Sequence, residues 1–131
     1  YCDLLYKTLM AKKPATSSYL MTSFDKRPLR YIKAKYPDAE MLFITSSPLS
    51  PEVIKETQEL GLNRVGCTIN GTSRTMVRTA QKAGLIVSCW PGLTVKDFIL
   101  GIALECDYLC SDVPVEVLTF MKANMPWVKI K

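Results

Sequence analysis

Five runs of apolar residues, each of strand length, recur along the chain at intervals of about 22 residues. The runs show little polar alternation, which is typical of strands buried on both faces, and each leads into a segment with helical spacing. Strands that alternate with helices predict a parallel sheet with right-handed crossovers. The runs begin near Tyr19, Met41, Arg64, Ile86 and Asp107.

The connecting segments carry start and stop signals of helices. A serine, a proline and an acid at 50–52 predict an N-cap and a first turn, and Gly61 predicts the end of that helix. Thr94 and Asp97 form a potential capping box, and Pro114 suits the first turn of a last helix. Another helix is predicted to start near Thr72 or Ser73 and to stop at Gly84, and an early helix is predicted over 3–12. In the last helix, one apolar face would be formed by Val117, Leu118 and Met121.

The repeat alone leaves two architectures open. Five units match a flavodoxin-like or receiver-like sandwich, and they also match more than half of an eight-stranded barrel whose beginning is absent. A receiver domain needs paired acids after its first strand and a lysine after its fifth, which this chain lacks. A flavodoxin-like module needs a phosphate-binding loop after its first strand, where Pro28 and a basic segment stand instead.

In either fold the working groups are expected where strands end and helices begin. Hydroxyls, an amide, two carboxylates and two aromatic rings fall at these positions. We expect Asp25 and Ser50 to cap helices, and Trp90, which precedes Pro-Gly at a strand end, to face a ligand. The five strand ends are 22–25, 45–47, 68–71, 89–92 and 111–114.

Composition and charge bear on the number of domains, the cellular location and the kinds of partner. The 131 residues suit one domain, 1–131, and the apolar runs are too short to cross a bilayer. The net charge of +5 is spread out, and its densest cluster, within 26–35, has the spacing of a solvated helix face without the aromatic pattern of a nucleic-acid binder. Five cysteines and no recognisable signal peptide predict reduced thiols and a cytoplasmic location. Cys106 and Cys110 alone, without histidine, do not predict zinc.

At the strand ends the sequence resembles the glycerophosphodiester phosphodiesterase family. The segment "YLMTSFDKRPLRYIKAKYPDAEMLFI" is similar to its Ser-Phe strand end and following "ALRxLKxxxP" helix. "MVRTAQKAGLIVSCWPGLT" matches "V..A...GL.V..W", and "ECDYLCSDVP" resembles "GVDGIITDxP". The motifs keep their order over 19 to about 120. The resemblance implies an α/β fold made of the last five βα units of a TIM-type (β/α)8 barrel.

The resemblance also implies a function for the complete protein. It would be a metal-dependent hydrolase with a divalent cation, Mg²⁺ or Ca²⁺, that splits glycerophosphodiesters into an alcohol and glycerol phosphate. The family's catalytic histidines and most of its carboxylates lie in its N-terminal half, and this chain has no histidine. Because hydrolysis needs an acid and a base, we expect no catalytic residue here, no metal bound by this chain alone, and no activity without the missing half of the barrel or a second chain.

For the site, the resemblance implies that Phe24 and Trp90 wall the pocket for a small phosphodiester substrate, the tryptophan against the glycerol. Ser23 and Ser111 would supply hydroxyl contacts, while Asp112 would anchor the last turn. Pro91-Gly92 and Glu105-Cys106 depart from the family pattern. The alternative is a non-catalytic barrel fragment that binds a partner chain or a phosphorylated ligand. A phosphodiester lyase of the same barrel class, such as a phospholipase, is a third interpretation.

Overall fold

Each apolar run forms a β-strand in the computed structural model, which describes residues 1–128. The first and last strands begin two residues and one residue after the predicted positions, and the other three begin where predicted. All neighbouring strands pair in parallel, in the order β1-β2-β3-β4-β5. The strands are β1 (Met21–Ser23), β2 (Met41–Pro48), β3 (Arg64–Thr68), β4 (Ile86–Trp90) and β5 (Tyr108–Leu109).

The helices begin at the predicted signals. Ser50 accepts a hydrogen bond from the Val53 amide at 3.3 Å, and the capping box of Thr94 and Asp97 is complete. Asp25 and Ser73 cap their helices in the same way, so the predicted caps are confirmed. The helices are α1 (Cys2–Lys12), α2 (Lys26–Lys35), α3 (Pro51–Glu59), α4 (Arg74–Lys82), α5 (Val95–Ala103) and α6 (Pro114–Asn124).

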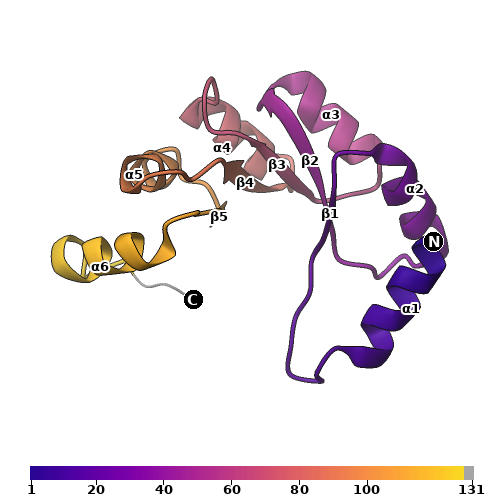
Figure 1. Ribbon diagram of the computed structural model, residues 1–131. Helices are drawn as coiled ribbons and strands as arrows, with labels where there is room; N and C mark the ends of the chain where they lie inside the picture. The colour runs from indigo at the N-terminus through magenta and orange to yellow at the C-terminus, as the bar shows by residue number, and fades with distance from the viewer. Residues whose placement is uncertain (129–131) are drawn as a thin grey trace.

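The strand order decides between the two architectures. A doubly wound sandwich reverses its strand order, so that its helices cover both faces of the sheet. Here the order never reverses, and Figure 1 shows α2, α3, α4 and α5 in an arc along one side of the strands. The flavodoxin-like and receiver-like interpretations are therefore excluded, and the sheet is an open portion of a barrel wall.

The hydrophobic core lies between the sheet and this arc of helices. Alternate residues of β3 and β4 point toward the helices, and Val65 and Val87 are completely buried there. The opposite, inner face carries Gly66, over which Leu42 packs. Since successive side chains of a strand alternate in direction, each strand contributes one row to the helix layer and one to the inner face.

Helix α6 departs in part from the sequence prediction. Val117 and Met121 are buried as expected, but Leu118 is exposed, so the predicted apolar face of three residues was wrong in one member. Val117 and Met121 are four positions apart and face the rest of the chain together, whereas Leu118, adjacent to Val117, is turned toward solvent. Among the described helices, none combines the length and the apolar character needed to span a membrane.

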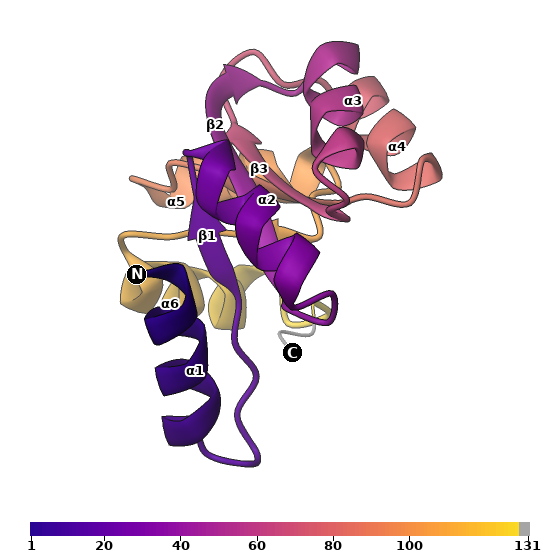
Figure 2. The same cartoon turned by 90° about the vertical axis from the view of Figure 1, so that its right-hand side faces the viewer.

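Helix α1 is attached to α2 through a charged cluster. Figure 2 shows α1 beside α2 at the β1 edge of the sheet. One oxygen of Asp3 accepts hydrogen bonds from Lys35 Nζ at 2.6 Å and from the Tyr31 hydroxyl at 3.0 Å, and the other oxygen accepts one from Tyr36 at 3.0 Å. The contact with Lys35 is the main cause that lowers the pKa of Asp3 to about 2. The cluster therefore contributes most to the attachment of α1 while Asp3 is ionised, beside the stacking of Tyr6 on Tyr36.

We expect Gly92→Ala to destabilise the protein by about 2 kcal/mol or more, measured by denaturant unfolding. A Cβ at Gly92 would lie 1.9 Å from the carbonyl oxygen of Cys110, which is backbone of the neighbouring strand end and cannot rotate away. Gly66→Ala is the matched comparison, because its Cβ would meet the flexible end of Leu42 at 3.0 Å. Equal losses in the two variants would contradict the close approach of β4 and β5.

We expect the attachment of α1 to weaken as the pH falls from about 4 toward 2. The folded-state pKa of Asp3 is below its ordinary value of 3.8, so its stabilisation is present above that value and is lost as the pH falls through about 2. Hydrogen exchange of the α1 amides measures the effect. Asp3→Asn should remove the pH dependence in this window, whereas Asp38→Asn, an exposed control, should keep it.

Candidate ligand-binding rim

Two aromatic rings meet at the carboxyl ends of the strands. Phe24 follows β1 and Trp90 ends β4, and their ring centroids are 5.7 Å apart with the planes at 84°. Phe24 is 57% exposed, so its ring is accessible from solvent. Edge-to-face contact is a favourable geometry for aromatic pairs. The structure thus brings together the two residues predicted to wall a pocket, and their contact with a ligand stays a prediction.

Trp90 also presents an unusual polar group. Its Nε1 is buried and has no hydrogen-bond partner within residues 1–128. Buried donors are almost always paired in folded proteins, because an unmade hydrogen bond costs free energy. The peptide bond between Trp90 and Pro91 is cis. Because Nε1 is buried by the chain itself, a ligand at the rim would meet the ring of Trp90 rather than this donor.

The polar residues after β1 are engaged in local hydrogen bonds. The Ser23 hydroxyl donates to the Asp25 carbonyl at 2.9 Å and accepts from the Asp25 amide at 3.0 Å. The Asp25 carboxylate caps α2 through the amide of Arg27 and pairs with its guanidinium, whose hydrogen bonds lower the pKa of Asp25. Ser23 therefore shapes the turn, and its predicted contact with substrate stays a prediction.

The last strand end is held by hydrogen bonds of Ser111 and Asp112. Ser111 Oγ accepts a hydrogen bond from the Val113 amide at 3.2 Å, and this bond fixes the turn before α6. The Asp112 amide donates to the Gly92 carbonyl at 2.8 Å, but its carboxylate has no hydrogen-bond partner among the described residues. The Asp112 backbone and the Ser111 hydroxyl therefore both hold this turn, and the Asp112 carboxylate is exposed at the rim. The predicted contact of Ser111 with substrate stays a prediction.

The middle of the rim carries hydroxyls and one amide. Thr45 Oγ1 accepts from the Ser47 amide, and the Thr68 hydroxyl donates to the Asn70 carbonyl, so both threonines stabilise turns. Ser46 and the side chain of Asn70 are exposed between Phe24 and Trp90 in strand order. These groups can form hydrogen bonds with a polar ligand but cannot act as an acid or a base near neutral pH.

The carboxylates of this rim are too few and too far apart in strand order to hold a divalent cation. A hard cation takes several oxygen ligands, and Asp25 is committed to Arg27 while Asp112 lies at a different strand end. Residues 1–128 contain no cluster of three or more aspartate, glutamate or cysteine side chains able to hold a metal ion. A divalent cation at this rim would need oxygen ligands beyond these two carboxylates.

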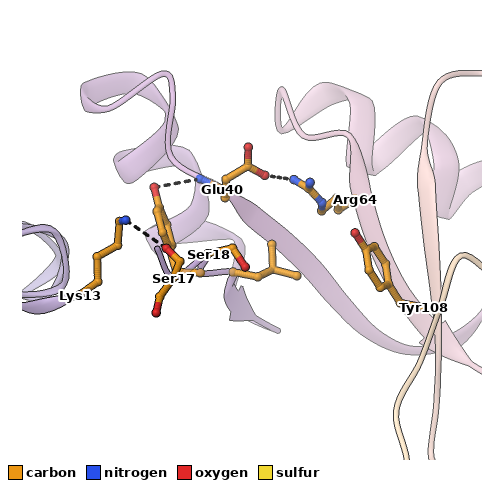
Figure 3. A pocket seen from close by; sticks show the side chains of 8 residues that line it. Lys13, Ser17, Ser18, Glu40, Arg64 and Tyr108 are labelled. Carbon is orange, nitrogen blue, oxygen red and sulfur yellow. Dashed lines mark hydrogen bonds and ion pairs between the residues drawn. The ribbon is translucent and has the colours of Figure 1, made fainter. Parts of the chain in front are cut away.

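A cavity of about 520 Å³ lies at the other end of the sheet. Figure 3 shows that side chains from strand beginnings and from the segment before β1 line it, and that Glu40 is paired with Arg64. In parallel βα folds the reactive groups lie at the carboxyl ends of strands, so this cavity is not the predicted site. Sequence reasoning missed it, although charged residues at the first position of a strand were a signal. It is lined by Lys13, Ser17, Ser18, Tyr19, Leu20, Glu40, Arg64 and Tyr108.

Comparison with known proteins gives matches in structure but not in sequence. No protein-family model and no curated protein matches the chain. Among solved structures, it is similar to a phosphodiesterase from Oleispira antarctica in complex with the product sn-glycerol-3-phosphate, with a TM-score of 0.83 and 16% identity over 92% of this chain and 49% of that chain.

Two further structures give the same result. A candidate glycerophosphodiester phosphodiesterase from Galdieria sulphuraria superposes with a TM-score of 0.81 at 20% identity, over 92% of this chain and 50% of that one. A glycerophosphodiester phosphodiesterase from Parabacteroides distasonis does so with a TM-score of 0.70 at 16% identity, over 93% and 50%. The chain spans about half the length of the structures it matches. It has the fold of five consecutive βα units of a TIM-type (β/α)8 barrel, as the sequence predicted.

Proposed function

We propose that this chain is the C-terminal part of a metal-dependent glycerophosphodiester phosphodiesterase. In the complete protein the enzyme hydrolyses glycerophosphodiesters to an alcohol and glycerol phosphate. The observation that carries the proposal is the aromatic pair of Phe24 and Trp90 at the rim of a half-barrel whose structural neighbours are phosphodiesterases. One of these neighbours holds sn-glycerol-3-phosphate, which is the product expected here.

The rim supports a role in binding rather than in the chemical step. Hydrolysis requires a group that activates the nucleophile and a group that protonates the leaving oxygen. The chain has no histidine, and the carboxylate of Asp25 is held ionised by Arg27. The catalytic groups and the cation ligands therefore come from the other part of the barrel, upstream in the same protein or on a second chain.

The aromatic pair suits the glycerol end of such a substrate. Trp90 offers a flat apolar surface toward the carbon chain, beside the ring of Phe24. The exposed hydroxyl of Ser46 and the amide of Asn70 can reach polar groups of a small ligand along the same edge. Binding a small polyol between an aromatic face and a few hydrogen-bonding groups is the usual design of such pockets.

We expect the 131-residue chain alone to show no turnover of glycerophosphocholine above buffer with Mg²⁺ or Ca²⁺. The longest form of the protein that includes the upstream segment should release choline and glycerol phosphate under the same conditions, and chelation of the cation should abolish this activity. Turnover by the isolated chain would refute the proposal that the catalytic groups lie outside it. An inactive long form that still binds glycerol phosphate would instead favour a non-catalytic binding module.

We expect Trp90→Ala in the active long form to raise KM about tenfold with a smaller change in kcat, because it removes the stacking surface for the glycerol. Trp127→Phe is the matched control, since that tryptophan is 72% exposed at the far C-terminal end. In the 131-residue chain the same control variant leaves Trp90 as the one tryptophan, so its fluorescence there reports binding of glycerol phosphate directly. An unchanged KM for Trp90→Ala would contradict the proposed pocket.

A further inference from the structure

Three thiols from different elements meet on the helix-covered side of the sheet. Cys89 of β4 lies 3.0 Å from Cys106 and 3.8 Å from Cys67 of β3, measured between Sγ atoms. Cys106 belongs to the segment between α5 and β5. The 3.0 Å separation needs about 1 Å of further approach to reach the length of a disulfide, which small side-chain rotations can supply.

The segment that carries Cys106 is held firmly against β4. At the end of α5 the Glu105 amide donates to Ile102 and the Cys106 amide to Gly101, which together form a Schellman motif. Glu105 takes the left-handed conformation, with φ of 65°, that glycine usually provides.

The Glu105 side chain makes a second attachment for this segment. Its carboxylate accepts two hydrogen bonds from Arg78 of α4, each of 2.7 Å. One residue beyond Cys106, the Asp107 amide donates to Val87 at 2.9 Å, and the Asp107 carboxylate accepts from the Val87 amide at 2.8 Å. The position of Cys106 relative to Cys89 is therefore fixed by the fold on both sides.

The two thiols differ in access. Cys89 is 1% exposed, whereas Cys106 is partly exposed. The contact with Cys106, followed by that with Cys67 and by burial, raises the pKa of Cys89. A reagent in solution therefore meets Cys106 first, and Cys89 stays a buried thiol until its neighbour has reacted.

We propose that Cys89 and Cys106 are a redox modification site that forms a reversible disulfide on reaction with a small disulfide such as glutathione disulfide. The Cys106 sulfur, on losing its proton, attacks one sulfur of the oxidant, breaks its S–S bond and releases one thiol. Cys89 then loses its proton and attacks the Cys106 sulfur of the mixed disulfide, which releases a second thiol. Two electrons and two protons pass from the protein to the oxidant, which is reduced to two thiols.

The disulfide ties the short edge strand to the body of the sheet. β5 pairs with β4 through two residue pairs only, Ser88 with Tyr108 and Cys89 with Leu109. A covalent bond from β4 to the segment just before β5 closes a loop that contains α5. Such a loop restricts the unfolded chain and slows the separation of β5 from the sheet.

The test uses the longest form of the protein, carrying Cys110→Ser so that peptide 97–122 contains one cysteine. It is equilibrated with increasing ratios of oxidised to reduced glutathione, alkylated, digested with trypsin and mapped by mass. We expect a cross-link between peptides 83–96 and 97–122 and the loss of two thiols. Reduction should restore both thiols.

Two variants and one condition make the result specific. Cys106→Ser should lose the cross-link, while Cys67→Ser, in which the proposed pair is intact, should keep it. Oxidation in denaturant should scatter the pairing over the available cysteines, which shows that the native fold directs it. The oxidised native protein should melt about 5 °C above the reduced form. A dominant cross-link from peptide 65–74 to 83–96, or four unreacted thiols at the most oxidising ratio, would overturn the proposal.

Discussion

The parallel pairing of β3 with β4 sets the positions of the core, the rim and the thiols. The two strands are in register over their full length, from Arg64 opposite Ile86 to Thr68 opposite Trp90. This register places the completely buried Val65 and Val87 side by side under the helices, and brings Cys67 and Cys89 together in the same row. A slip of one residue would turn every one of these side chains to the other face of the sheet.

Sequence reasoning recovers the elements because their signals are local. Each apolar run predicts a strand, and a cap such as Ser50 or Thr94 follows it and predicts the start of the next helix. Neither prediction needs information about distant contacts. The choice of a barrel over a sandwich was different. It depended on a family resemblance in the sequence, and only the strand order, which is a long-range property, demonstrates it physically.

The details of the site depend on distances that a sequence does not contain. Phe24 and Trp90 lie 66 positions apart, and their contact follows from the curvature that brings β1 and β4 toward one another across the inner face. Ser111 and Asp112 are neighbours, and the direction of one turn decides which side chain caps it. The cavity beside Glu40 and Arg64 also depends on the position of the chain before β1, which the charged residues at the strand beginnings do not reveal by themselves.

The rim and the thiol pair are adjacent in sequence and separate in space. Cys89 points toward the helices, and Trp90, the next residue, points toward the inner side of the sheet, because successive side chains of a strand alternate. A bond at Cys89 would therefore leave the aromatic surface open while it restrains the backbone from which the indole projects. The close approach of Gly92 to Cys110, and the hydrogen bond from the Asp112 amide to the Gly92 carbonyl, join the segment after β4 to the segment after β5. The attachment of β5 and the position of Trp90 at the rim therefore both depend on the backbone of β4.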